Sequence, residues 1–356
     1  MSSQSGVTRH RGERMANIRD VAKKAGVSVA TVSRVLNRAS NVSPKTATAV
    51  LSAMQELRFT PNGLARGLAL NRTRTIALLI PNIVNPLYPE MAKGVEDVAH
   101  QKGYNVLLCN TEEKVEKERD YLAMLIERRV DGFILMSTLL TNDDLLRIRE
   151  RNIPFVLTGR YHQDLDADIV YTDYAYGSYL VVHHLLEAGY QRIAHISGSA
   201  AQWESREKLS GFEKALREAQ LAIETKYIVE GDNEIEGGYL GTIRLLHLSE
   251  KPQAIFAAND LMAIGAIDAI KAQGLRVPSD VAVVGFDDIR MSTLVEPKLT
   301  TVSNPVHKMG LIGARLLFDH IDNGAGEDAT QKILLQPKLM VRRSCGHENR
   351  LREIFN

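Results

Sequence analysis

Cysteine is scarce in this chain: its 356 residues include only Cys109 and Cys345, which lie far apart. Two distant cysteines provide neither the closely spaced set that holds a metal ion nor the framework of a small disulfide-linked domain. We therefore expect no metal site and no structural disulfide. A reducing cytoplasm is the simplest location for such a protein.

Long apolar segments are also absent, and no uninterrupted run approaches the ~20 residues that cross a bilayer. The first 14 residues, MSSQSGVTRHRGER, carry basic side chains but no apolar segment of a secretory signal. We expect them to form a disordered tail, with Met15 as the functional start. The remaining length exceeds what one hydrophobic core usually organises, so two or three domains are expected.

Motifs typical of enzymes are missing as well. The chain has no phosphate-binding GxxxxGK[ST] motif, no GxSxG nucleophile elbow and no HExxH metal-binding pair. The adjacent His183 and His184 cannot point both rings at one metal from a helix. We predict that the protein is not an enzyme and needs no cofactor.

The net charge of +1 conceals a strong asymmetry. Residues 1–75 contain 13 lysines and arginines against 3 acidic residues, whereas the remainder contains 31 against 40. Ten of the 13 basic residues lie between Arg19 and Arg74, mostly in periodic segments rather than in a featureless tail. A basic head on an acidic body is therefore expected to contact a polyanion such as DNA at one end.

Two short helices are predicted in this head. The apolar residues of the first fall at the spacing i, i+3, i+4, i+7 of one buried stripe: Ile18, Val21, Ala22 and Ala25. Gly26 permits a tight turn, and Ser28 is placed to cap a second helix. The buried face of that second helix is Val32, Val35 and Leu36. Two helices joined by so short a turn are typical of the helix-turn-helix motif.

The opposite side of the second helix carries short residues and one basic fork, as insertion into the major groove requires: Val29, Ala30, Ser33 and Arg34. A third helix is predicted with Ser43 as its cap and Pro44 at its first position. Its expected buried residues are Ala47, Val50, Leu51, Met54 and Leu57. Three helices would complete a small core.

Residues 16–75 resemble the lactose/galactose repressor family, whose head has the pattern DVAxxAGVSxxTVSRVLN followed by PNxxARxL. This chain shows that pattern from Asp20 to Asn37 and again from Pro61 to Leu68. The resemblance implies base contacts by Val29, Ala30 and Arg34, and phosphate contacts by Ser28, Thr31, Ser33, Asn37 and Ser43. It also implies a hinge segment that folds on the operator, where Asn62, Ala65 and Leu68 meet the minor groove.

After Arg74, apolar runs alternate with amphipathic helical segments. The runs predicted as buried strands are 75–80, 105–109, 132–136, 154–157, 192–197, 254–258 and 281–286. The helical patterns between them lie near 89–102, 115–129, 142–151, 205–219, 236–248 and 260–273. Repeated β-α units predict an α/β core with parallel sheets, and the number of units is enough for two sheets.

Loops that follow parallel strands are where ligands bind in such sheets. Polar residues gather there, including Asn82, Asn85 and the Asn259-Asp260 pair. The core also resembles the repressor family throughout residues 74–343, which implies a periplasmic-binding-protein fold with ligand in a cleft between two subdomains. Matching positions imply a pocket of Tyr88, Gln202, Glu204, Lys208, Asn233, Asn259 and Asp287.

Three positions depart from the family's usual pattern. Lys208 stands where an arginine is common, and Asn233 stands where an aromatic ring often stacks. Gly159-Arg160 occupies a stretch that usually reads Asp-Arg. Arg160, Arg206 and Lys208 together suggest an anionic carbohydrate, either a sugar acid or a sugar phosphate. A neutral sugar stacked on Tyr88 or Trp203 is the alternative.

The predicted organisation has five parts. They are a tail (1–14), a helix-turn-helix domain (15–60), a hinge (61–73), a core (74–343) and a C-terminal tail (344–356). The core is expected to consist of one subdomain from about 74–173 with 304–333 and another from about 174–303 with 334–343. The last segment lacks leucine heptads, so we expect a homodimer rather than a tetramer.

The function predicted from these features is a ligand-responsive transcription regulator, most simply a repressor of carbohydrate-utilisation genes. Its expected partners are operator DNA, a small effector and a second copy of the chain, with no membrane contact. A transport-type sugar-binding protein would lack the head and would need a signal peptide. An enzyme with a similar core would turn its ligand over.

Overall fold

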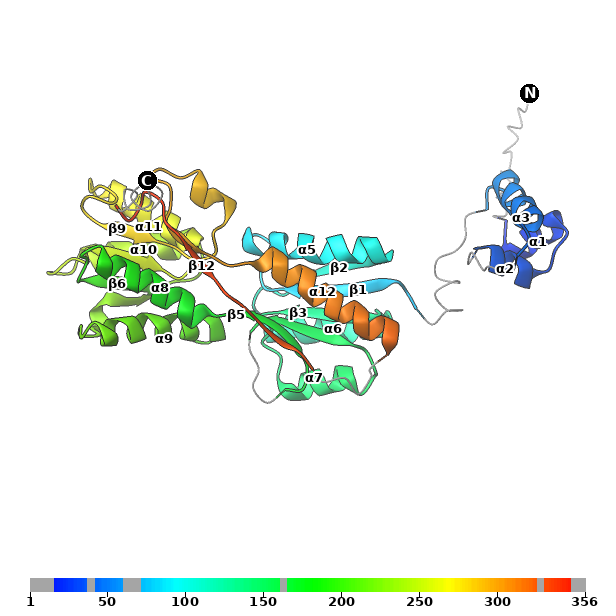
Figure 1. Cartoon of the computed structure of the whole chain (residues 1–356), viewed down its shortest axis with the longest axis horizontal. Helices are drawn as coiled ribbons and strands as arrows, with labels where there is room; N and C mark the ends of the chain where they lie inside the picture. The colour runs from blue at the N-terminus through cyan, green and yellow to red at the C-terminus, as the bar shows by residue number, and fades with distance from the viewer. Residues whose placement is uncertain (1–15, 37–41, 60–71, 161–164, 325–329, 347–356) are drawn as a thin grey trace, which may run out of the picture. The chain divides into compact units, whose positions relative to one another are not determined.

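The computed structural model describes residues 16–36, 42–59, 72–160, 165–324 and 330–346. The chain divides into two compact units, one that ends at Thr73 and one that begins at Arg74 (Figure 1). We call them the head and the core, and each is described by itself.

The head consists of three helices, α1 (Ile18–Ala25), α2 (Val29–Leu36) and α3 (Pro44–Glu56). Gly26 ends α1 in the left-handed conformation with a φ of 66°, which a glycine adopts without steric cost. The Ser28 hydroxyl accepts a hydrogen bond from the Thr31 amide at 3.1 Å, and Ser43 caps α3 through the Thr46 amide at 3.2 Å. Both predicted caps and the turn glycine are therefore confirmed.

The centre of the head is small. Its fully buried apolar side chains among the described residues are Val21, Ala22, Val32, Val50 and Ala53. The prediction that Leu51 is buried is wrong, because this side chain is 53% exposed. The inward stripe of α3 runs through Val50 and Ala53 at the i, i+3 spacing, and Leu51 lies one residue around the helix from it.

The first lobe of the core is built on a six-stranded parallel sheet. Its strands follow the order β11-β5-β4-β3-β1-β2. Their bounds are β1 (Thr75–Ile80), β2 (Asn105–Asn110), β3 (Gly132–Met136), β4 (Phe155–Gly159), β5 (Asp168–Thr172) and β11 (Lys332–Leu335). The helices of this lobe are α5 (Leu87–Lys102), α6 (Val115–Glu127), α7 (Asn142–Arg149) and α12 (Val306–Asn323).

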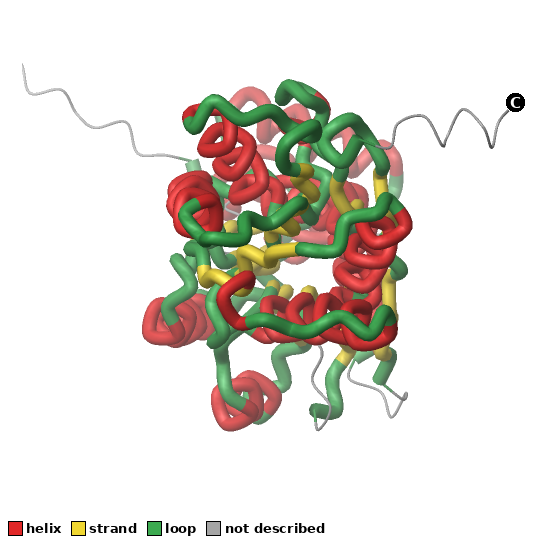
Figure 2. The backbone as a smooth tube through the Cα atoms, turned by 90° about the vertical axis from the view of Figure 1, so that its left-hand side faces the viewer, coloured by secondary structure: helices red, strands yellow, loops and turns green. Residues whose placement is uncertain are grey.

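The second lobe contains a four-stranded parallel sheet in the order β7-β6-β8-β9 and a short antiparallel pair, β10 with β12. The strands are β6 (Ile193–Ser197), β7 (Ile228–Glu230), β8 (Ala254–Ala257), β9 (Ala282–Val284), β10 (Thr301–Ser303) and β12 (Lys338–Met340). The helical segments are α8 (Tyr174–Glu187), α9 (Trp203–Glu218), η1 (Thr225–Tyr227), α10 (Ile235–Leu246), α11 (Asp260–Ala272) and η2 (Arg290–Thr293). Helices flank the strands on both sides (Figure 2).

The chain passes between the two lobes three times: from β5 to α8, from β10 to α12, and from β11 to β12 (Figure 1). Helices α5 and α12 lie side by side, because glycines let their backbones approach. A Cβ atom at Gly94 would overlap the carbonyl oxygen of His307, and one at Gly310 would overlap that of Met91. These contacts attach α12, which is distant in sequence, to the first lobe.

The predicted fold class, an α/β core with parallel sheets behind a helix-turn-helix head, is confirmed. The predicted strands and helices all occur, with ends that move by a few residues. In the parts of the chain that the structure describes, no helix is both long enough and apolar enough to span a membrane.

Candidate functional site

One face of the head presents the side chains expected to read DNA. Val29, Ala30 and Arg34 are exposed on α2, and Val29 is 41% exposed although it is apolar. Val32 of the same helix is fully buried, so the exposed residues lie on the side that faces away from the core of the head. The geometry therefore leaves a short apolar surface and one guanidinium free to meet base edges.

The residues expected to anchor phosphates lie at helix starts or beside the reading face. Ser28 is exposed, Thr31 is half-buried, and their hydroxyls are hydrogen-bonded at 2.9 Å. Ser33 is half-buried, and exposed Ser43 occupies the N-cap of α3. Helix N-termini carry unpaired amides and a partial positive charge, which suits a phosphate. The other expected DNA contacts, Asn37, Asn62, Ala65 and Leu68, lie outside the described residues.

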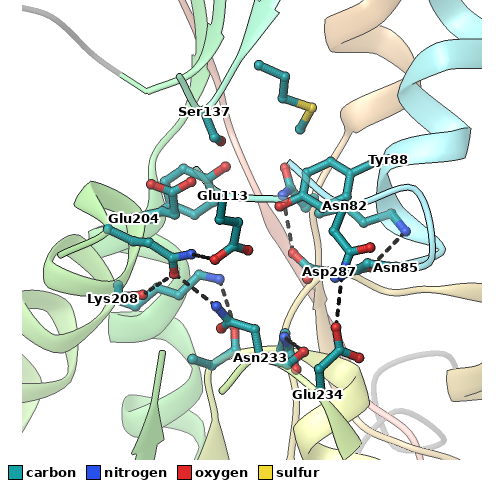
Figure 3. Close-up of a pocket in the computed structure, with 18 residues that line it drawn as sticks. Asn82, Asn85, Tyr88, Glu113, Ser137, Glu204, Lys208, Asn233, Glu234 and Asp287 are labelled. Carbon is teal, nitrogen blue, oxygen red and sulfur yellow. Dashed lines mark hydrogen bonds between the residues drawn. The ribbon is translucent and has the colours of Figure 1, made fainter. Parts of the chain in front are cut away.

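A pocket lies between the lobes of the core, where loops from both sheets converge (Figure 3). The first lobe contributes Asn82, Asn85, Tyr88, Glu113 and Ser137. The second lobe contributes Gln202, Glu204, Lys208, Asn233, Glu234, Asn259 and Asp287. These residues follow β1, β2, β3, β6, β7, β8 and β9, so the pocket lies beyond the carboxyl ends of parallel strands, where ligands bind in such sheets.

Two side-chain hydrogen bonds cross this pocket from lobe to lobe. Asn82 donates to a carboxylate oxygen of Glu234 at 2.9 Å, and Gln202 donates to Glu113 at 2.7 Å. Burial and neighbouring carboxylates raise the pKa of both Glu113 and Glu234 above the ordinary range. The bonds hold the two walls of the cleft together directly.

Asp287 and Lys208 form the buried charged floor of the pocket. Burial raises the pKa of Asp287 to about 6, although Lys208 and a hydrogen bond from Asn304 favour its ionised form. Lys208 donates to the carbonyl of Ala258 at 2.7 Å and lies 4.2 Å from the ring centre of Phe286. Burial lowers the pKa of this lysine. Both groups are desolvated in a cleft, which is a typical signature of a functional site.

Amide side chains connect the rest of the second lobe's wall. Asn259 caps α11 through the Met262 amide at 2.8 Å and donates to the carbonyl of Asn233 at the same distance. Asn233 in turn donates to Gln202 at 2.9 Å. Asn259 therefore has a structural role, and the hydrogen bonds of Asn233 and Gln202 hold their polar groups in fixed positions at the pocket surface.

The other three residues expected to contact the ligand lie outside this pocket. Arg160 and Trp203 line an adjoining compartment rather than the pocket floor. Arg206 lines neither space: it is exposed on α9, and its guanidinium binds the carbonyls of Ala200 and Ala201. The inward face of α9 passes through Ser205 and Lys208, and Arg206 lies off that face.

Several lining residues were not among the expected contacts: Glu113, Ser137, Tyr174, Glu234 and Asn304. Glu113 and Ser137 could have been found, because each follows a predicted strand closely. Tyr174 and Asn304 stand at crossings between the lobes, which periodicity does not reveal. Their inclusion depends on how distant segments come together.

Carboxylates outnumber cations in the pocket. Glu113, Glu204, Glu234 and Asp287 line it, with Lys208 as the buried cation. Within the described ranges, no group of three or more histidine, cysteine, aspartate or glutamate side chains is placed to hold a metal ion. The chemistry of the pocket is therefore that of hydrogen-bond acceptors and amides around ring surfaces.

Comparisons with known proteins agree with this geometry. Residues 17–62 match the model for bacterial regulatory proteins of the lacI family, and residues 182–345 match a periplasmic binding protein-like domain. The HTH-type transcriptional repressor PurR of Actinobacillus pleuropneumoniae serotype 3 is 38% identical over 94% of this chain and 100% of its own length. That of Proteus mirabilis is 39% identical, over 93% and 97%.

Solved structures are similar over the same span. The lac repressor dimer bound to operator and the anti-inducer ONPF has a TM-score of 0.84 and 30% identity, covering 93% of this chain and 99% of that chain. A complex of the transcriptional regulator CelR with cellobiose has a TM-score of 0.68 and 33% identity, over 92% and 99%.

A helix-turn-helix head joined to a two-lobed ligand-binding core defines a ligand-responsive, DNA-binding transcription regulator. The curated relatives are transcriptional repressors, which are regulators rather than enzymes. The chain belongs to the lacI family of bacterial regulatory proteins.

Proposed function

We propose that this protein represses transcription from a pseudo-palindromic operator as a cytoplasmic homodimer, and that a neutral carbohydrate in the core cleft controls its affinity for DNA. The observation that carries the effector assignment is the pocket itself. Amide and carboxylate groups from both lobes surround the rings of Tyr88 and Tyr174. Hydroxyl groups satisfy such acceptors and donors, and the apolar face of a sugar ring suits an aromatic side chain.

The charge of the pocket favours a neutral sugar over the anionic one that the sequence suggested. Four carboxylates line the space, and Arg206, one of three cations on which the anionic hypothesis rested, lies outside it. A phosphate or sugar acid placed there would meet like charges in a poorly solvated cleft, which costs free energy. The complex of CelR with cellobiose, a neutral disaccharide, lends support from a similar core.

The proposed DNA contacts are those of the head: Val29, Ala30 and Arg34 to base edges, with Ser28, Thr31, Ser33 and Ser43 to phosphates. One head covers half of a pseudo-palindromic site, so two copies are needed. The hinge would couple cleft and operator by folding on DNA, with Leu68 as a wedge in the minor groove. Equal amide exchange of residues 62–68 with and without operator would contradict that coupling.

The effector proposal is tested by thermal unfolding with a panel of neutral sugars, sugar acids, sugar phosphates and nucleosides. A ligand present at 100 times its dissociation constant stabilises the folded protein by about 2.7 kcal/mol. We expect a neutral sugar to raise the melting temperature and to change operator affinity in a fluorescence-anisotropy titration. Stabilisation by phosphorylated or carboxylated sugars alone would contradict the proposal.

A further inference from the structure

The ligand pocket continues into a second compartment. Five residues line both spaces and form the neck between them: Tyr88, Glu113, Ser137, Gln202 and Glu204. The hydrogen bond from Gln202 to Glu113 crosses this neck at 2.7 Å. The second compartment has a free volume of about 140 Å³, compared with about 50 Å³ for the first. The larger space is therefore the one that the described side chains leave less filled.

The walls of the second compartment differ from those of the first. Apolar surface comes from Pro81, Leu139 and the indole of Trp203, whereas the first compartment is lined mainly by amides and carboxylates. Trp203 is half-buried and meets Tyr174 edge-on at 5.9 Å between ring centres. An indole face beside small apolar groups offers a stacking surface for a ring.

Arg160 provides the polar anchor of this compartment. It follows β4, and one of its terminal nitrogens donates to the carbonyl of Thr138 at 3.2 Å. Its Nε atom is buried and has no hydrogen-bond partner, and the carboxylates of Glu204 and Glu118 attract the charge of this arginine. The nearby carboxylate of Glu118 is already used, because it accepts from the Thr138 hydroxyl at 2.6 Å and from the Leu139 amide.

Arg160 is the cation that lines this compartment, and a bound group that accepts from its guanidinium would gain a charge-assisted hydrogen bond. The preceding residue, Gly159, adds no side chain beside the guanidinium. Its φ of 83° and its closeness to the Ser137 hydroxyl, 2.6 Å from where a Cβ would stand, disfavour any larger residue there. Arg160 itself is half-buried and lines the compartment.

We propose that the second compartment binds a second, neutral glycosyl unit, so that the effector is a disaccharide rather than a monosaccharide. The second ring stacks on Trp203, and its hydroxyl oxygens accept from Arg160. An apolar group would bring no acceptor to the Arg160 guanidinium, and a uronate ring would meet Glu113, Glu118 and Glu204 across the same space. This inference rests on the proposed carbohydrate effector and adds its size and charge.

The test is calorimetric titration of the full-length protein. The probes are glucose, galactose and ribose; the neutral disaccharides cellobiose, lactose and maltose; and digalacturonate. We expect at least one neutral disaccharide to bind tenfold or more tightly than any of the monosaccharides. Equal affinity for a monosaccharide, or tighter binding of digalacturonate, would overturn the inference while leaving a carbohydrate effector in place. Failure of every sugar to bind would overturn the effector proposal and this inference with it.

Two variants locate the second ring. Arg160→Met should weaken the preferred disaccharide tenfold or more and change monosaccharide affinity less than twofold, while Arg147→Met, at an exposed position of α7 in the same lobe, should change neither. Leu139→Trp should fill the compartment and likewise weaken binding of the disaccharide but not of the monosaccharide. This variant still tests the inference if the arginine variant fails to fold. Equal losses for both sizes of sugar would show a structural role for Arg160 and contradict the inference.

Discussion

The head and the core differ in whether the residues proposed to bind ligands are exposed or buried. In the head, Val29 and Arg34 are exposed and Val32 is buried, so the residues proposed to meet DNA contribute little to folding. In the core, Asp287 and Lys208 are both functional candidates and buried. A binding surface on an exposed helix face costs the fold almost nothing, whereas a desolvated binding site lowers stability and recovers it on ligand binding.

The largest expected effect comes from the buried side of the head. Val32→Asp places an uncompensated carboxylate among the four other buried residues of the head, and the several kcal/mol that this costs exceed what so small a core supplies. We expect operator affinity to fall at least 100-fold while the melting temperature of the core and its sugar binding stay unchanged. Calorimetric melting and DNA titration of the full chain measure both effects.

Leu51→Asp is the matched control for that variant, because Leu51 is exposed on α3. It should leave the head folded, as judged by its proton NMR dispersion. Unfolding by both substitutions would show that the burial pattern of the head is not what separates these positions. Unchanged DNA binding by Val32→Asp would contradict the division between the two faces of α2.

The next largest effect concerns the core, where function and burial coincide. The pKa of Asp287, about 6 against an ordinary 3.8, corresponds to about 3 kcal/mol that opposes folding when the carboxylate is ionised. That cost is absent below pH 4 and complete above pH 6. Asp287→Asn should therefore raise the free energy of unfolding by up to about 3 kcal/mol at pH 7.5, have little effect at pH 4, and weaken sugar binding at least tenfold.

Chemical denaturation at several pH values measures this change in the free energy of unfolding. Asp268→Asn is the control, because Asp268 is exposed on α11. The control should shift stability by less than 0.5 kcal/mol. If Asp287→Asn destabilised the protein at pH 7.5, the carboxylate would be a net structural contributor, and the contrast between head and core would not hold.

The two regions also differ in how much of them the sequence could predict. Helices α1 to α3 depend on contacts three or four residues apart and on the caps Ser28 and Ser43, so periodicity and cap chemistry specify them. Leu51 was misplaced because it is apolar and adjacent to the true stripe. Apolar identity alone does not fix a side chain's direction on a helix.

The core was predictable at its strands but less so at its site. Loops after strands were expected to carry ligand groups, and Tyr88, Asn259 and Asp287 from such loops line the pocket. The sequence gives no signal that Arg206 turns outward to bind backbone carbonyls or that Tyr174 joins the lining from a crossing segment. Those outcomes depend on the packing of segments that are distant along the chain.

A smaller effect is expected on the exposed face of the head. Val29 and Ala30 can contact thymine methyl groups but cannot form bidentate hydrogen bonds to guanine or adenine. Replacing the pair with Gln and Arg should change the preferred half-site by about 1–3 kcal/mol per altered base pair and leave the melting temperature within error. Selection from a random DNA pool measures the preference. Recovery of the parental half-site would show that these positions do not read bases.

The smallest effect is expected at the cross-cleft hydrogen bond from Asn82 to Glu234. The bond is only partly buried and joins an amide to a carboxylate, so its net contribution should be about 1 kcal/mol. A double-mutant cycle of Asn82→Ala and Glu234→Ala, read by denaturation of the sugar-free protein, should give a coupling energy of about 0.5–1.5 kcal/mol. The pairing of Asn82→Ala with Asp120→Ala, at an exposed position of α6, should give none.

The same cycle read by sugar affinity decides what the bond does. If it only holds the lobes together, both single variants open the cleft and affect binding of all sugars alike, because a less populated closed state lowers every apparent affinity by one factor. If Asn82 and Glu234 also contact the first sugar ring, the coupling energy in the sugar-bound state stays above zero and differs from one sugar to another. A coupling energy of zero in both states would show that the lobes are held by their apolar contacts and not by this bond. The core would then resemble the head, with polar groups that bind ligands and apolar groups that hold the fold.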